Sequence, residues 1–185
     1  MKNILVTAAM LLLIIGCGSD PVAPTFQAAE YFPLHVGDTW KYKDSHSAIF
    51  EYSFVSTEVF SGKSYYKMLK YYQGQLSDSM YYRVADSKVY LFRHYSTGLG
   101  DREYSYIDFA NGKDSTAGYV KSTEDSIQLQ AGMFYSAKTV SWYGVFDEGP
   151  PYETYSPGIG LIKRREIFGN SFDLIYAKVG GKVYQ

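Results

Sequence analysis

The chain has little of what many functional sites require. It holds one cysteine, Cys17, among 185 residues, so no disulfide can form within the chain and no cysteine cluster can hold a metal. It also lacks an excess of charge, because 18 Lys and Arg stand against 19 Asp and Glu. Binding to nucleic acid needs a basic stripe that neutralises phosphates, so we expect no nucleic-acid partner.

Signatures of common catalytic sites are absent from the sequence as well. It contains no G-x-S-x-G, H-E-x-x-H, P-loop or dinucleotide fingerprint. The three histidines, His35, His46 and His94, are scattered, and no two stand at the i, i+4 spacing of a helix or the i, i+2 spacing of a strand. We therefore expect no metal, no cofactor and no catalytic residue, and we expect the protein not to be an enzyme.

Only one long apolar run occurs, and it lies at the start of the chain. Lys2 supplies a positive charge, and the twelve residues 4–15 follow without any charge. A helix of this length spans about 18 Å, whereas the hydrocarbon core of a membrane is about 30 Å thick. The pattern is typical of a removable export signal rather than a permanent membrane span, and we assign it to residues 1–16.

The residues that end this run resemble the lipobox of bacterial lipoproteins, in which an aliphatic pair and a Gly or Ala precede a cysteine. Here the motif reads Ile14-Ile15-Gly16-Cys17. The resemblance implies that Cys17 carries a diacylglycerol thioether and that cleavage follows Gly16, so acyl chains would hold the protein on a membrane. Gly18 follows, not the Asp that favours inner-membrane retention, which implies the outer membrane if the host is Gram-negative. A secreted protein with an incidental cysteine is the alternative.

The remaining chain is long enough for one domain. Removal of residues 1–16 leaves 169 residues and changes the net charge from −1 to −2. That length suits one domain with a substantial core and is too short for two comfortable ones. Residues 17–29 contain Pro21, Pro24 and small side chains, so we predict a flexible tether from the lipidated Cys17. Residues 30–185 would then form a single β domain.

Aromatic residues are abundant. The chain has 20 Tyr, 11 Phe and 2 Trp, all beyond residue 25, and such residues fit a pleated, half-buried sheet. Apolar segments alternate with turn residues at intervals of roughly ten residues. We predict an all-β fold, an antiparallel meander that forms a curved sheet, half-barrel, barrel or sandwich, with little helix beyond the signal peptide. The predicted strands cover residues 48–60, 65–73, 80–85, 88–95, 103–109, 119–121, 127–130, 134–143, 159–168 and 172–179.

Several strands are apolar on both faces. Val89 and Leu91 alternate with Tyr90 and Phe92, so neither face of that strand is polar. A strand of this kind predicts a sheet that is curved or closed rather than a flat single layer. The dipeptide at residues 111–112, Asn-Gly, predicts a tight hairpin turn because both residues tolerate positive φ.

Two segments are distinctive. Residues 31–42 read YFPLHVGDTWKY, in which Trp40 and Tyr42 share a face and would plug one end of the core. Residues 155–165 read YSPGIGLIKRR, in which Pro157-Gly158 suits the centre of a type II turn. These segments resemble a family of largely uncharacterised bacterial envelope lipoproteins with an N-terminal Y-F-P-L-x-x-G-x-x-W-x-Y and a late P-G-x-G-L. The resemblance implies an all-β envelope domain and carries over no catalytic residue; by architecture alone it suggests half-barrel lipoproteins that handle lipids or other lipoproteins.

Five residues are candidates for contact with a ligand or partner. Lys163 and Arg165 would share one strand face while Arg164 takes the other, which indicates either an anion site or a solvated, edge-protecting strand. Trp142 and Tyr143 lie just upstream of the acidic segment 147–153, which contains Tyr152, and could form an aromatic platform for a sugar with it. Core packing of Trp142 is the alternative. We interpret the carboxylates of residues 147–153 as a solvated loop rather than a catalytic pair.

The sequence thus favours a non-enzymatic, lipid-anchored envelope protein. Tyr and Phe on both strand faces lead us to expect an apolar ligand or a partner protein bound on a curved aromatic sheet. A structural or assembly accessory of an outer-membrane complex is one alternative, which would expose tyrosines in one patch. A carbohydrate-binding module is another. The expected location is the cell envelope, with membrane attachment through the acyl chains on Cys17.

Overall fold

The computed structural model describes residues 28–94, 100–110, 117–142, 151–167 and 169–185. These residues form one short helix and twelve strands, and no helix among them is long and apolar enough to cross a membrane. The predicted export signal and most of the predicted tether lie outside the described residues. The elements are α1 (Ala28–Tyr31), β1 (Thr39–Asp44), β2 (Ile49–Phe60), β3 (Lys63–Tyr72), β4 (Gln75–Ala85), β5 (Lys88–Arg93), β6 (Arg102–Asp108), β7 (Gly118–Leu129), β8 (Gly132–Ser141), β9 (Tyr152–Ser156), β10 (Gly160–Arg165), β11 (Ser171–Val179) and β12 (Lys182–Tyr184).

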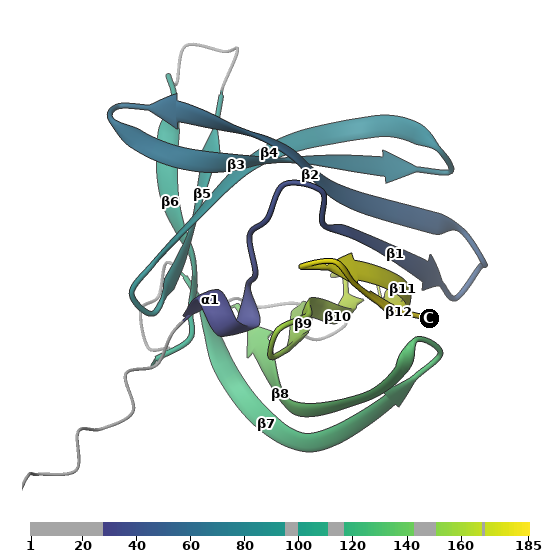
Figure 1. The fold of residues 1–185 in the computed structure, drawn as a ribbon. Helices are drawn as coiled ribbons and strands as arrows, with labels where there is room; N and C mark the ends of the chain where they lie inside the picture. The colour runs from purple at the N-terminus through teal and green to yellow at the C-terminus, as the bar shows by residue number, and fades with distance from the viewer. Residues whose placement is uncertain (1–27, 95–99, 111–116, 143–150, 168) are drawn as a thin grey trace, which may run out of the picture.

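The strands follow one another in a single sheet that closes into a barrel. Each strand pairs with the next along the chain, and β1 also pairs with β11 (Figure 1). Since β1 occupies one edge of β11, both β10 and β12 pair with its other edge, at opposite ends. The described neighbours are antiparallel except β6 and β7, which are parallel over two residue pairs. The predicted all-β barrel is therefore confirmed, although the prediction of an antiparallel meander did not include the parallel pairing of β6 and β7.

Local sequence explains most of the hairpins. In β2, Tyr52 and Phe54 are buried while residues between and beyond them are more exposed, as a period of two requires. The β2–β3 turn places Ser61 at φ 48° and Gly62 at φ 75°, so both central residues lie in the left-handed region. Two such residues give the turn a twist that matches the flanking strands.

The strand boundaries differ from the prediction in several places. For example, β4 begins at Gln75 and not at residue 80. The segments predicted at 119–121 and 127–130 belong to one strand, β7, whose middle is exposed and polar on both faces and so shows no alternation. The strands β9 and β12 were not predicted. The Asn-Gly pair at residues 111–112 lies outside the described residues, and the strands that flank it pair in parallel, not as a hairpin.

The N-terminal segment closes one end of the barrel. Helix α1 begins at Ala28, within the predicted tether, and Ala28 and Tyr31 are both buried. The chain between α1 and β1 then runs across the barrel opening (Figure 1). Phe32 packs against Tyr82 and Tyr155, with ring centroids 5.2 and 5.9 Å apart.

The two distinctive sequence segments meet in space. Trp40 is 5% exposed, and its indole Nε1 donates a hydrogen bond of 2.7 Å to the carbonyl oxygen of Ile159. Gly160 adopts φ +90°, and a Cβ atom there would stand 3.3 Å from Pro33 Cδ. The predicted turn also forms, with Gly158 at φ +70° and Ile159 N bonded to Ser156 O. Trp40 therefore plugs the core, as predicted, against the turn before β10.

Candidate functional site

A cavity of about 240 Å³ opens inside the barrel. Its lining combines apolar side chains, most of them buried, with five tyrosines and five charged residues. Among the charged residues Glu153 is buried, whereas Lys70, Asp78, Arg93 and Arg164 are more exposed. The apolar lining includes Phe32, Pro33, Trp40, Phe54, Met68, Met80 and Leu91; the tyrosines are Tyr42, Tyr52, Tyr82, Tyr106 and Tyr155; the charged residues are Lys70, Asp78, Arg93, Glu153 and Arg164.

A buried ion pair forms the polar centre of this interior. Glu153 on β9 and Arg164 on β10 are direct partners in the antiparallel ladder, so both side chains point to the same face. Arg164 Nε lies 3.6 Å from Glu153 Oε1. The Glu153 side chain is 6% exposed, and a buried carboxylate is tolerated only when it is paired and hydrogen-bonded.

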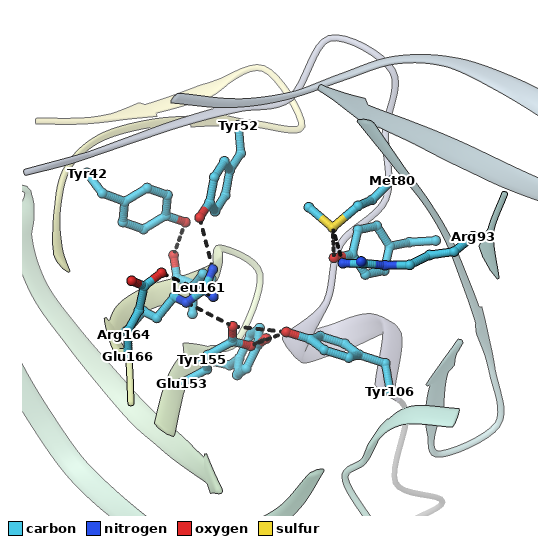
Figure 2. A network of polar contacts seen from close by, with 11 residues as sticks. Tyr42, Tyr52, Met80, Arg93, Tyr106, Glu153, Tyr155, Leu161, Arg164 and Glu166 are labelled. Atoms are coloured by element: carbon cyan, nitrogen blue, oxygen red, sulfur yellow. Dashed lines mark hydrogen bonds and ion pairs between the residues drawn. The ribbon is translucent and has the colours of Figure 1, made fainter. Parts of the chain in front are cut away.

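Two tyrosines complete the coordination of the carboxylate. The Tyr106 hydroxyl lies 2.9 Å from both oxygens of Glu153, and the Tyr155 hydroxyl donates to Oε2. Figure 2 shows Tyr106 reaching Glu153 from the far side of the interior. Since Tyr106 belongs to β6 and Tyr155 to β9, the carboxylate links strands on different walls of the barrel.

The protonation of these groups is fixed by their surroundings. Burial raises the pKa of Tyr106 and of Tyr155 well above the usual value, and the negative charge of Glu153 raises both further. Burial lowers the pKa of Arg164, but the combined attraction to Glu153, Tyr52, Tyr106 and Glu166 outweighs that effect and raises the pKa overall. The tyrosines therefore remain hydrogen-bond donors and Arg164 remains a cation at neutral pH. These four groups act as a fixed polar framework rather than as an acid–base pair.

Arg164 and Leu161, on the same strand, also contact tyrosines of β2 and β1. Its Nη1 donates a hydrogen bond of 3.2 Å to the Tyr52 hydroxyl, and its Nη2 lies 3.4 Å from Glu166 Oε1. The Tyr42 hydroxyl donates to the carbonyl oxygen of Leu161 at 2.8 Å (Figure 2). Most hydroxyls that face the cavity thus already have partners within the protein.

Two further hollows flank this framework. One, of about 310 Å³, shares Tyr106, Glu153 and Arg164 with the interior cavity, so the polar framework stands between the two spaces. The other, of about 290 Å³, lies on the opposite face of β9 and β10, where Thr154 and Lys163 line it.

The structure brings together some of the predicted contact residues. Tyr152, Lys163 and Arg165 line the hollow on the opposite face of β9 and β10, so Lys163 and Arg165 do share a face. Trp142 is half-buried and packs on Tyr106, with ring centroids 5.5 Å apart. Tyr143 lies outside the described residues. None of the four described residues lines the interior cavity.

Sequence reasoning missed the residues at the centre of the barrel. The segment that contains Glu153 was interpreted as a solvated loop, and for Glu153 this interpretation is wrong because the residue is 4% exposed within β9. Arg164 was assigned to the face opposite Lys163 and Arg165, but that face was not recognised as the interior. The segment Tyr152–Ser156 offered no signal, because polar and apolar residues do not alternate in it and four of its five residues are buried.

The histidines stand apart from the cavity. His35 Nδ1 lies 2.9 Å from Asp38 Oδ2, and His94 Nδ1 lies 2.9 Å from Asp101 Oδ1. Neither histidine lines the interior cavity. In the described part of the chain, no group of three or more His, Cys, Asp or Glu residues is placed to hold a metal ion.

Comparison with known proteins identifies no family. No family model matches the chain, and no curated protein matches it by sequence. A candidate lipoprotein from Parabacteroides distasonis shares 14% identity, with a TM-score of 0.49 over 84% of this chain and 100% of the other. A candidate exported protein with a YmcC-like fold from Bacteroides fragilis also shares 14% identity, with a TM-score of 0.46 over 80% of this chain and 98% of the other.

Proposed function

We propose that the protein is a non-enzymatic, lipid-anchored envelope protein that binds a small, largely apolar ligand inside its barrel. The observation that carries this proposal is the interior cavity of about 240 Å³. Its walls combine buried Trp40, Phe54 and Met68 with a few fixed polar groups. Small-molecule sites in proteins share this composition, because apolar walls supply affinity and a few polar groups set the orientation of the ligand.

The size of the cavity limits the ligand. Sites for drug-sized molecules occupy roughly 300–1,000 Å³, so this cavity suits a smaller molecule or one part of a larger one. The hollow beyond Tyr106 and Glu153 could hold a further part of the ligand only if these two side chains moved. We therefore expect a compact ligand that lies between Trp40 and the tyrosines.

The attachment to the envelope is proposed from the sequence alone. Residues 14–17 read IIGC and follow an uncharged apolar run, so Cys17 would carry the acyl chains that hold the protein on the membrane. We propose the outer membrane as its location in a Gram-negative host. The barrel would then stand at the membrane surface, connected by the residues between Cys17 and Ala28.

The placement of aromatic side chains favours ligand binding over the alternatives. Exposed tyrosines occur at Tyr72, Tyr104 and Tyr135, but these belong to β3, β6 and β8, which are not adjacent strands. A docking surface would need them in one patch. Trp142 is also in contact with Gly118, where a Cβ atom would stand 2.7 Å from its Cε2, and with Tyr106, so only part of its ring is left to line the neighbouring hollow.

The proposal is tested by native mass spectrometry of the full, lipidated chain extracted in a mild non-ionic detergent. We expect an additional small mass that is lost on denaturation. Met80 lines the cavity, so Met80→Trp should fill it and remove the bound mass. Met133→Trp is the matched control, because Met133 is 46% exposed on β8.

Two results would contradict the proposal. Folded protein that carries no additional mass, even after incubation with lipid extract, would show that the cavity binds nothing from the envelope. A bound mass that survives Met80→Trp would place the ligand elsewhere on the protein.

A further inference from the structure

The charged side chains of the interior cavity differ in burial: Glu153 is buried at the polar centre, whereas Lys70, Asp78 and Arg93 stand at the more exposed side, which we call the mouth. Lys70 on β3 is half-buried and Arg93 on β5 is exposed, whereas Trp40 and Phe54 are 5% and 2% exposed and form the deep wall. A molecule that fills the cavity would therefore meet an apolar wall at one end and two cations at the other.

These two cations are not neutralised by the protein. Lys70 Nζ lies 5.5 and 5.8 Å from the ring centroids of Phe50 and Tyr52, and no carboxylate in the described part of the chain forms an ion pair with it. Arg93 Nη2 contacts the Met80 thioether at 3.7 Å (Figure 2) and likewise has no carboxylate partner among the described residues. Guanidinium and ammonium groups bind an oxyanion far more strongly than a thioether or a ring.

Asp78 is the carboxylate directly opposite Lys70 in the β3–β4 pairing, but it does not form an ion pair with Lys70. It also lines the cavity. Its Oδ1 accepts a hydrogen bond of 2.8 Å from the backbone N–H of Ser79. The other carboxylate of the cavity, Glu153, is held by Arg164 and two tyrosines.

The electrostatic environment of Lys70 also favours the binding of an anion. Burial lowers the pKa of Lys70 and the positive charge of Arg164 lowers it further, whereas the carboxylates Glu166, Asp78 and Glu153 raise it without offsetting burial and Arg164. The two lowering effects disfavour the ammonium cation in the empty protein. An anion bound at the mouth would counter both, because it would replace the lost hydration and screen Arg164.

We propose that the cavity selects small amphipathic molecules that carry one oxyanion group, a carboxylate or a phosphate, which Lys70 and Arg93 bind at the mouth. The alkyl part packs against Trp40, Phe54 and Met68. This inference rests on the proposed ligand-binding function and names the ligand class of that site.

The test uses photoreactive ten-carbon probes of one design that end in a carboxylate, a phosphate or a hydroxyl. Each is titrated onto the full, lipidated chain in non-ionic detergent, and labelled cavity peptides are quantified by mass spectrometry. The two anionic probes, or one of them, should reach half-saturation at a concentration at least about tenfold lower than the alcohol. The anion that binds more tightly identifies the head group as carboxylate or phosphate.

Variants assign the preference to the two cations. Lys70→Met combined with Arg93→Met should bring the anionic probes to the level of the alcohol. Lys67→Met is the matched control, because Lys67 lies on the same strand, does not line the cavity and pairs with Glu58 at 3.3 Å. Saturable labelling by the alcohol in every variant shows that the cavity is intact, and the single Arg93→Gln change offers a milder test at an exposed position.

The outcomes separate the two proposals. Equal half-saturation by anionic and neutral probes, or a preference that persists in the double variant, would overturn the oxyanion selectivity and leave ligand binding in place. Absence of saturable cavity labelling by any probe would overturn both the selectivity and the proposed function.

Discussion

Glu153 lies directly opposite Arg164 on neighbouring strands, and their ion pair is the charged centre of the barrel interior. The two residues differ in the other groups that they contact. Glu153 accepts hydrogen bonds from two tyrosines, whereas Arg164 also contacts Tyr52 and Glu166. The loss of one partner should therefore have unequal effects on the free energy of unfolding.

Removal of the cation should cost more than removal of the anion. Arg164→Met leaves a buried carboxylate without a counterion, which we expect to lower the free energy of unfolding by about 3–5 kcal/mol. Glu153→Gln leaves Arg164 with Glu166, and we expect a loss of about 1–3 kcal/mol. Urea unfolding of both variants and of the double variant measures the coupling between them. Additive losses would mean that the two side chains do not interact.

The close approach of the two distinctive segments gives a second prediction. Gly158 and Gly160 both have positive φ, but only Gly160 has neighbours within 4 Å of a Cβ atom. Gly158→Ala should cost about 1 kcal/mol for its backbone conformation alone. Gly160→Ala adds a clash with Pro33 and should cost about 2–4 kcal/mol. Equal melting temperatures for the two variants would show that Pro33 moves aside freely.

Acid should weaken the protein through Glu103 on the outer wall. Burial raises the pKa of Glu103, but hydrogen bonds from Arg83, Lys63 and Tyr65 outweigh that effect and lower the pKa to about 2. In the unfolded chain the group titrates at its ordinary value of 4.5. The unfolded state therefore takes up the proton first, so this stabilisation is complete above pH 4.5 and is lost as the pH falls towards 2.

The matching variant is Glu103→Gln. We expect it to lower the free energy of unfolding at neutral pH by about 1–2 kcal/mol, since the site is partly solvated. The difference from the unchanged protein should shrink as the pH falls below about 4.5. Glu58→Gln, at a more exposed ion pair, is the control. A difference that stays constant across this range would contradict the role given to Glu103.

The proposed lipidation depends on a single residue. Cys17→Ala removes the only thiol, so we expect no acyl group on the protein and no cleavage after Gly16. Metabolic labelling with a radioactive fatty acid, together with the mass of the mature N-terminus, measures both events. Label retained by the variant would show that acylation occurs elsewhere, and cleavage without label in the unchanged protein would favour an ordinary secreted form.

The fold was predictable where alternation is local. Tyr52 and Phe54 stand two residues apart in β2 and are both buried, as the sequence pattern indicates. The plug formed by Trp40 was predictable for the same reason, because a large aromatic at the start of a strand has few other places to pack. The middle of β7 was missed because exposed side chains on both faces leave no periodic signal.

The site was less predictable because its burial is non-local. Sequence alone assigns Glu153 to an acidic loop, but in the structure its face of β9 is the interior of the barrel, where the residue is buried. Alternation correctly separates Arg164 from Lys163 and Arg165, but it does not say which face becomes the interior. That choice is made when β11 pairs with β1, which lies far from β9 in the sequence.

The closing pair between β1 and β11 also sets the order in which the molecule can be completed. Hairpins between successive strands join residues that are close in the sequence, so they can form while the chain is synthesised. Trp40 pairs with Ala177 near the C-terminus, so this pairing can form only after almost the whole chain has been made. Contacts of such long range slow folding. Until β11 pairs with β1, the backbone hydrogen-bonding groups on that edge of β1 are free to pair with other chains. A polypeptide truncated before Ser171 should thus aggregate rather than form a smaller barrel, and protection of β1 amides from hydrogen exchange should be among the last to develop.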